Sequence, residues 1–389
     1  MKEPFAWDHY SDQPAIIRDK LLKRKMRRSA LFSLIKTFLI ALIVLPIAFI
    51  VTFFLPRKKI TGEEFFAMGV NLSNSPSLVP EYINELGMKK LLVRIALWEM
   101  DRLDEYIAFI DSLQEHHITV AILQDREHIT DLNLTKKHLT QIFTALEHRC
   151  NTYVIGSTIN RAKWGFFSVN EYLKFYSVAY VLKKELFPNL KFIGSQTIDF
   201  ELHFTTHTLF NLQNIYFDAL GTLLYVDRRG APENTQMGFN LMGKINLIDA
   251  LMRLSFKTGN ELIITETNWP IKNTAPYAPT SEYECVDEEE YTNYMIRYHL
   301  LTFATQKVSS VYWHQLIAPG YGLIDNREGV IVKRGAFYAY QAMLTHLRDA
   351  TFKYFTETNG DYRLMCSTPR GPLTITWTLN STPIYTYKA

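Results

Sequence analysis

The sequence predicts an α/β fold: a (β/α)8 TIM barrel preceded by a transmembrane helix and followed by a small β appendage. Two observations lead to it. Short runs rich in β-branched and aromatic residues alternate with amphipathic runs, at intervals of about 25 to 40 residues. The first such run is followed by Gly69-Val70-Asn71-Leu72-Ser73. This is not the glycine-rich phosphate loop that normally follows the first strand of an open doubly wound sheet, which is the competing architecture.

Eight runs have the length and composition of buried strands. They are Phe65–Asn71, Leu91–Leu97, Ile118–Leu123, Thr152–Ile155, Lys191–Ser195, Ala219–Tyr225, Leu262–Glu266 and Ser310–Gln315. Apolar residues at helical spacing predict helices between and after them, for example over Asp101–His116, Asp287–Thr305 and Arg334–Leu347. We therefore expect the barrel to occupy residues 62–347.

A hydrophobic segment over residues 31–56 predicts a single membrane-spanning helix. No charged residue lies between Thr37 and Leu55, and a span needs about 20 apolar residues. The preceding basic tail, residues 1–30, has a dense cationic cluster over residues 18–28. The positive-inside rule then puts the N-terminus in the cytoplasm and the barrel in the periplasm, anchored in the inner membrane. A cleaved signal peptide fits less well, because the charged leader is long and no small-residue cleavage site follows.

The last segment, residues 348–389, loses the helical pattern. Strand-like runs at Thr351–Phe355, Asp361–Cys366 and Leu373–Leu379 are separated by turn-forming residues. They predict a small β subdomain.

Composition excludes several classes of function. The net charge of the 389 residues is +3, so we expect no nucleic-acid partner. The three cysteines, Cys150, Cys285 and Cys366, are far apart and form no CxxC or Cys/His cluster. We expect buried thiols, with a single disulfide as the alternative. The histidines have no metal-binding spacing, and we expect neither a metal nor a cofactor.

The most informative segment is Ile263–Pro270, where an apolar run ends in Glu266 and continues into Asn268 and Trp269. In a barrel, a carboxylate at the end of a strand lies at the mouth, where active sites are built. There it can meet a sugar ring, with the indole as a stacking platform. A surface glutamate after an edge strand is the alternative.

The other strand ends supply further polar and aromatic side chains. An arginine inside a strand, Arg94, needs a carboxylate partner in the core, and we expect Glu266 to be that partner. The remaining candidates are Trp98 after strand two, Thr158, Asn160 and Trp164 after strand four, Asp199 and Glu201 after strand five, Tyr225 and Asp227 after strand six, and Trp313 and His314 at strand eight.

In this order along the chain, these residues resemble the retaining TIM-barrel glycoside hydrolases, nearest to the family 39 and family 5 type. The resemblance covers most of the chain after residue 62. It implies that Glu266 is the nucleophile, that Arg94 orients it, that Tyr225 donates a hydrogen bond to it, and that Trp313 floors a sugar subsite. It also implies a substrate-binding set of Arg94, Asn160, Trp164, Tyr225, Asn268, Trp269, Trp313 and His314.

One departure is decisive for the mechanism. Where the family has a glutamate as general acid/base at the end of strand four, this chain has Thr158. Threonine is a poor proton donor near neutral pH, so the two-carboxylate mechanism cannot run in its usual form. Either Asp199 or Glu201 replaces the missing acid, with Asp227 behind them, or the substrate has a leaving group that needs little protonation.

Two functions follow. The first is a membrane-anchored glycoside hydrolase or transglycosylase that acts on an envelope or surface polysaccharide. The alternative is an inactive glycan-binding scaffold of a polysaccharide synthesis or export system, whose proteins would be its partners. A second carboxylate opposite Glu266 would favour catalysis.

Overall fold

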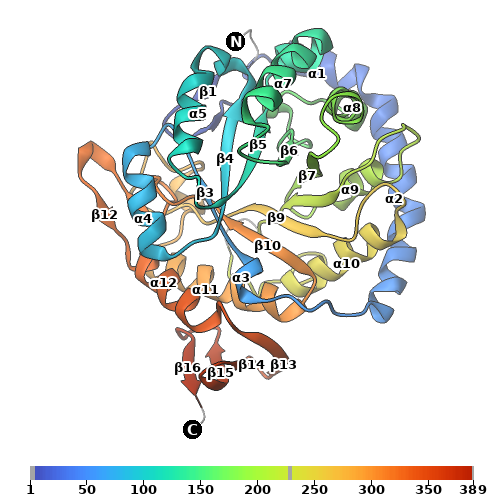
Figure 1. Ribbon diagram of the computed structural model, residues 1–389. Coiled ribbons are helices and arrows are strands. Elements are labelled where there is room, and N and C mark those ends of the chain that lie inside the picture. Colours follow the sequence, from blue (N-terminus) through green and yellow to red (C-terminus); the bar gives the residue numbers. More distant parts are fainter. Residues whose placement is uncertain (1–4, 227–229, 388–389) are drawn as a thin grey trace. The chain divides into compact units, whose positions relative to one another are not determined.

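The computed structural model describes residues 5–226 and 230–387 and contains the predicted barrel (Figure 1). Eight parallel strands close in the order β10-β3-β4-β5-β6-β7-β8-β9. Closure is made by β10 and β3, which pair with Val311 opposite Phe66 and Trp313 opposite Met68. The predicted (β/α)8 architecture is therefore confirmed.

Each predicted strand forms within a few residues of its expected bounds. The strands are β3 (Phe66–Val70), β4 (Lys90–Ala96), β5 (His117–Leu123), β6 (Thr152–Ile155), β7 (Lys191–Ile198), β8 (Ala219–Leu223), β9 (Leu262–Thr267) and β10 (Val308–Trp313). Nearly all of their residues are buried, which explains why they read as continuous apolar runs. The largest difference is in β7, which continues to Ile198 past a register shift between Ser195 and Thr197.

Helices form over the three runs predicted by range, as α5, α11 and α12, although α5 is shorter than the predicted Asp101–His116. Ten helices belong to the described part of the barrel segment of the chain. They are α3 (Gly62–Phe65), α4 (Val79–Leu86), α5 (Leu103–Asp111), α6 (Arg126–Thr130), α7 (Leu132–Leu146), α8 (Val169–Glu185), α9 (Leu202–Leu209), α10 (Leu241–Leu254), α11 (Glu288–Thr305) and α12 (Gly335–Leu347). The short 3-10 turns among them are η2 (Pro76–Leu78), η3 (Leu97–Arg102), η4 (Ala162–Trp164), η5 (Glu282–Glu284) and η6 (Arg327–Gly329). At α11, Asp287 and Glu290 form a capping box that satisfies the free N–H groups of the first turn.

The C-terminal segment is a four-stranded antiparallel sheet, formed by β13 (Thr351–Thr358), β14 (Asp361–Thr368), β15 (Gly371–Thr378) and β16 (Ile384–Tyr387). The sequence predicted three strands and missed β16, which is only four residues long. Leu364, Ile375 and Trp377 are buried. Arg297 of α11 donates to the Thr378 carbonyl, which joins the sheet to a barrel helix. A two-stranded pair, β11 (Ile324–Asp325) and β12 (Val332–Lys333), lies between β10 and α12.

By its contacts the chain divides into two compact units, which are described separately below. The first comprises residues 1–54, 92–224 and 250–265, and the second residues 55–91, 225–249 and 266–389.

The N-terminal tail has more structure than the sequence predicted. Two short strands, β1 (Trp7–Asp8) and β2 (Gln13–Pro14), pair as a hairpin. Asp19 caps α1 (Lys20–Ser29), which carries the cationic cluster. A second helix, α2 (Leu31–Val51), runs into the turn η1 (Thr52–Phe54). Over residues 31–54 this segment is long and apolar enough to cross a membrane, a property that it shares with signal sequences.

In the described conformation α2 packs along α9 (Figure 1). Its small residues Ser33, Thr37, Ala41 and Ala48 are the buried ones. The Thr37 hydroxyl donates to the Ser33 carbonyl at 2.8 Å and lies 2.7 Å from His207 Nδ1, so the ring donates through Nδ1. Large apolar residues cover the rest of the helix: Phe32, Ile35, Leu39, Leu42, Ile43, Ile47 and Ile50 are exposed, and Phe38 stacks on His203 of α9.

We predict that acid weakens the packing of α2 on α9. Burial lowers the pKa of His207 to about 4, and Lys36 adds to the effect. Burial also lowers the pKa of His203. The nearby Glu201 carboxylate opposes this effect on the pKa, and the Arg161 guanidinium adds to it. Since both folded pKa values lie below the ordinary one of about 6.5, the undocked chain binds more protons as pH falls from about 6.5 toward 4. Docking is then lost over this window.

Hydrogen exchange of the α9 amides, corrected for the intrinsic effect of pH, measures this. We expect less protection of α9 at pH 5 than at pH 7.5. His207→Gln keeps a side-chain hydrogen-bonding group without a proton to gain, so its protection should change less. Equal pH dependence in the two chains would contradict the role given to His207.

Candidate functional site

In the second unit, Glu266 lies near the carboxyl end of β9 and is held by a tyrosine. The Tyr225 hydroxyl donates to Glu266 Oε1 at 2.7 Å, and His314 Nδ1 lies 4.0 Å from Glu266 Oε2. The Glu266 side chain is 18% exposed. The carboxylate is therefore reachable from solvent, while the tyrosine fixes its orientation.

His314 is itself positioned by three contacts. Its backbone N–H donates to the Thr267 carbonyl at 3.1 Å, and its carbonyl accepts from the Asn268 side chain. Its ring stacks on Tyr321, with 5.4 Å between ring centroids and an interplanar angle of 11°. Asn268, predicted to bind substrate, thus holds the backbone of His314.

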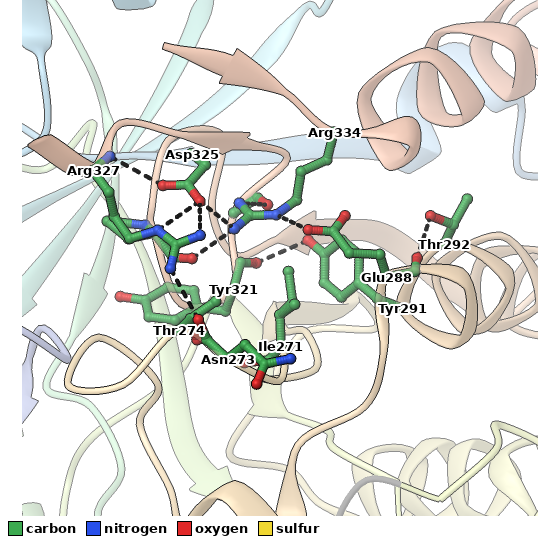
Figure 2. A network of polar contacts seen from close by, with 12 residues as sticks. Ile271, Asn273, Thr274, Glu288, Tyr291, Thr292, Tyr321, Asp325, Arg327 and Arg334 are labelled. Atoms are coloured by element: carbon green, nitrogen blue, oxygen red, sulfur yellow. Dashed lines mark hydrogen bonds and ion pairs between the residues drawn. The ribbon is translucent and has the colours of Figure 1, made fainter. Parts of the chain in front are cut away.

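The loop that carries Tyr321 is fixed by an ion-pair network centred on the buried Arg334 (Figure 2). Arg334 donates to the carbonyls of Pro319 and Gly322 and to Asp325 Oδ2 at 2.9 Å. Asp325 also pairs with Arg327, and Arg334 with Glu288 at the start of α11. The Tyr291 hydroxyl donates to the Tyr321 carbonyl at 2.8 Å. These bonds fix the backbone on either side of Tyr321, and so they fix the position of its ring on the His314 ring.

The two tryptophans predicted to stack on sugar, Trp269 and Trp313, are packed inside this unit. They are 1% and 0% exposed, and they stack on each other at 6.0 Å. Their indole N–H groups donate to the Gly230 carbonyl and to the Tyr291 hydroxyl. With neither ring open to a ligand, the prediction that they form a stacking platform or a subsite floor is wrong for this conformation. They support the segment that carries Glu266 and His314.

In the first unit, Thr158 follows β6 in a tight turn. Gly156 has φ +77° and Thr158 has φ +51°, a left-handed conformation that is uncommon outside glycine. Gln124 bonds both the N–H and the carbonyl of Ser157, at 2.8 and 3.0 Å. The Thr158 hydroxyl lies 3.1 Å from that of Ser157. Thr158 is therefore part of a rigid, hydrogen-bonded turn.

Asp199 and Glu201, the candidate acid/base residues, both pair with Arg161, at 2.5 and 2.7 Å. Asn160 donates to Glu201 at 2.8 Å and exchanges two hydrogen bonds with the backbone of Ile198. Asn160 therefore ties the loop after β6 to the end of β7, rather than presenting its amide to a ligand. Each carboxylate has a guanidinium partner, which is the arrangement of an ion pair.

A carboxylate does meet Arg94, and it comes from the N-terminal hairpin. Arg94 donates to Asp12 Oδ2 at 3.0 Å, and its guanidinium lies 5.6 Å from the Trp7 ring and 5.9 Å from the Trp164 ring. The Arg94–Glu266 pairing stays a prediction. Trp164 is 6% exposed because Trp7 covers it.

Sequence reasoning missed three contributors: Asp12, Trp7 and Tyr321. Asp12 and Trp7 precede the predicted span, and no periodicity links them to the barrel. A signal for Tyr321 was present in Tyr321-Gly322-Leu323 after strand eight, although its stacking partner was not evident. Asp227, named with strand six, lies outside the described residues.

No family model and no curated protein matches this sequence. Solved structures do match. One is a family 39 glycoside hydrolase from the gut symbiont Bacteroides cellulosilyticus, at a TM-score of 0.62 and 12% identity over 82% of this chain and 72% of that one. The fold of this chain is therefore similar to the barrel of that enzyme.

Two further structures agree. A GH30 endoxylanase from Clostridium papyrosolvens has a TM-score of 0.56 and 11% identity, over 83% of this chain and 82% of its own. A family 1 β-glucosidase from Thermotoga maritima has a TM-score of 0.52 and 12% identity, over 75% and 99%. Enzymes of three glycosidase families share this barrel. The structural similarity therefore establishes the fold, and the function has to be argued from the residues of the site.

We predict that Arg334→Met destabilises the chain strongly, whereas Lys333→Met does not. The Arg334 side chain is 2% exposed, so its removal leaves buried carbonyls and Asp325 short of a partner, at a cost of about 3 kcal/mol. The neighbouring pair of Lys333 with Glu85 is more exposed and contributes at most about 1 kcal/mol. Urea unfolding of the two variants measures the difference. Equal midpoints would show that the network does not hold the loop.

Proposed function

We propose that this protein is a membrane-anchored glycoside hydrolase or transglycosylase, with Glu266 as nucleophile and an envelope or surface polysaccharide as substrate. The observation that carries the proposal is the 2.7 Å hydrogen bond from Tyr225 to a partly exposed Glu266 at the end of a barrel strand. The barrel's likeness to glycosidases of three families supports it.

The Tyr225 hydroxyl suits a nucleophilic carboxylate in two ways. It occupies Oε1 and so aims Oε2 as the attacking atom, which is the oxygen 4.0 Å from His314. It also stabilises the carboxylate when the glycosyl–enzyme bond breaks and the negative charge returns. Attack of Glu266 on the anomeric carbon expels the leaving oxygen, and water or a second sugar then releases the glycosyl group.

The leaving group is where this chain departs from the usual mechanism. With Thr158 at the position of the acid, and with Asp199 and Glu201 both paired to Arg161, we infer that the bond cut in the polysaccharide has a leaving group that needs little protonation, such as a phosphate that links one sugar to the next. The same requirement holds for transfer of the sugar to another acceptor, because the first step expels the same leaving group. A non-catalytic glycan binder is the outcome that a complete absence of turnover would favour.

The membrane assignment rests on residues 31–54, which have the length and apolar composition of a span. The cationic cluster in α1 precedes them. By the positive-inside rule we infer a single pass in the inner membrane, with the N-terminus in the cytoplasm and the barrel outside it. Proteins that synthesise or export the polysaccharide would then be neighbours in the same membrane.

We predict that Glu266→Gln abolishes release of reducing ends from the extracted surface polysaccharide, by at least about 10³-fold, since the nucleophile is lost. Tyr225→Phe should retain the fold and lose about ten- to a hundredfold, as expected for one hydrogen bond to a charged group. Undiminished release from the Glu266→Gln chain would remove Glu266 from the mechanism.

Asp199→Asn and Glu201→Gln, assayed separately, test the leaving-group argument. We expect each to leave turnover within about threefold of wild type, because an ion pair with Arg161 does not supply a proton. A residue that acts as general acid would instead cost about 10²–10⁴-fold. That loss would be confined to substrates with poor leaving groups and absent with dinitrophenyl glycosides, and it would identify the acid.

A further inference from the structure

The N-terminal hairpin covers the aromatic surface at the ends of β4 and β6, and we define the plug as residues 5–14. Trp7 lies between two tryptophans of the first unit, at 5.0 Å from Trp98 and 5.8 Å from Trp164. Phe5, which is 4% exposed, packs on Trp98 at 5.1 Å. The plug thus fills the place beside Trp164 with an aromatic ring.

Polar bonds to Arg94 and Lys163, at the rim of this aromatic surface, also hold the plug. Asp12 accepts from Arg94 at 3.0 Å, and the Arg94 guanidinium also lies over the Trp7 ring. Lys163 donates to the Gln13 side chain. Inside the plug, Asp8 accepts from the Ser11 hydroxyl at 2.7 Å. The plug therefore contacts Arg94 and Trp164, the two residues of this surface that the resemblance to glycoside hydrolases assigns to substrate binding, and also Trp98 and Lys163.

The position of the plug conflicts with a spanning α2. Residues before Leu31 and residues after Phe54 lie on opposite sides of a membrane that α2 crosses. Arg94 and Trp164 follow the helix, and the plug precedes it. The chain can dock the plug or span the bilayer, but it cannot do both.

The two helices that follow the plug in the chain, α1 and α2, are suited to a move from the barrel surface into a bilayer. The outer face of α2 is apolar, and the buried residues of the helix are all small, with Phe38 stacked on His203 at the edge of the contact. None of the residues of α1 is buried, and its lysines and arginines precede the span. Such a cluster is attracted to anionic lipid headgroups, and burying the exposed apolar face of α2 in lipid then favours insertion.

We propose that the plug is an intramolecular occupant of the aromatic surface formed by Arg94, Trp98 and Trp164, and that insertion of α2 into a bilayer withdraws it and opens this surface to glycan. The inference rests on the proposed function, because it takes Arg94 and Trp164 as glycan contacts. As a tethered group, the plug competes at an effective concentration of about a millimolar. The uninserted chain is therefore held closed.

A cleavable cross-link tests the two halves of the proposal. Gln13→Cys with Lys163→Cys places thiols on the plug and on the rim, and the native Cys150, Cys285 and Cys366 are buried. The full chain is synthesised cell-free, without lipid or with vesicles of phosphatidylethanolamine and phosphatidylglycerol. It is then treated with a disulfide-containing bismaleimide, and each single-cysteine variant serves as control.

We expect most of the lipid-free chains to cross-link, and the yield to fall at least about fivefold in vesicles, because insertion places the thiols on opposite faces. The linked chain should bind the extracted polysaccharide at least about tenfold more weakly than the same chain after the linker is reduced in the presence of vesicles. In the lipid-free chain, Trp7→Ala should raise binding about tenfold, since it removes two aromatic contacts of the plug.

Equal cross-linking with and without vesicles would overturn the withdrawal, and failure to cross-link in the lipid-free chain would overturn the docking. Polysaccharide binding that is indifferent to the linker would overturn the role of the plug as occupant. If cross-linking changes as expected while no form of the chain binds polysaccharide, docking and withdrawal are supported, and the proposed glycan function fails instead.

Discussion

Pairing between β10 and β3 closes the barrel, and the positions of the candidate residues depend on that closure. A parallel sheet that closes on itself has no free edge, so every strand is buried on both faces and each ends at a defined point. Most strand residues are then apolar, and the candidate side chains lie at or just beyond the carboxyl ends of the strands. Arg94 and Glu266 are among the last three residues of β4 and β9, whereas Thr158, Asp199, Tyr225 and His314 follow β6, β7, β8 and β10.

In the second unit, the polar bonds around the site orient one carboxylate, that of Glu266. Tyr225 bonds Glu266 directly, while Asn268, Tyr321 and the Arg334 network act on it through His314. In the first unit, the polar bonds pair carboxylates with arginines. There Arg161 takes up both spare carboxylates, and Arg94 bonds the N-terminal plug. Among the described residues, one carboxylate is oriented by a tyrosine and the two candidate acids are ion-paired, an arrangement that suits the activated leaving group proposed above.

The sequence was sufficient for the barrel because its strands are buried and therefore apolar throughout, and the turns between them are marked by polar residues. It was also sufficient to find Glu266 and Tyr225, which lie at the carboxyl ends of β9 and β8. It failed for contacts between distant parts of the chain. Two-residue strands such as β1 and β2 have no periodicity, so the docking of Trp7 and Asp12 could not be foreseen. The burial of Trp269 and Trp313 depends on which way each ring turns after its strand, and no local pattern records that.

Covalent trapping tests the role of Glu266 most directly. A panel of 2-deoxy-2-fluoroglycosyl fluorides needs no acid, because fluoride leaves unaided, and the electron-withdrawing 2-fluorine slows release of the glycosyl group. Incubation with the full chain in vesicles, proteolysis and mass spectrometry should place one sugar on the peptide that contains Glu266, and the same peptide of the Tyr225→Phe chain should label about ten- to a hundredfold more slowly. Labelling of another carboxylate, or no labelling by any member of the panel, would contradict Glu266 as the nucleophile.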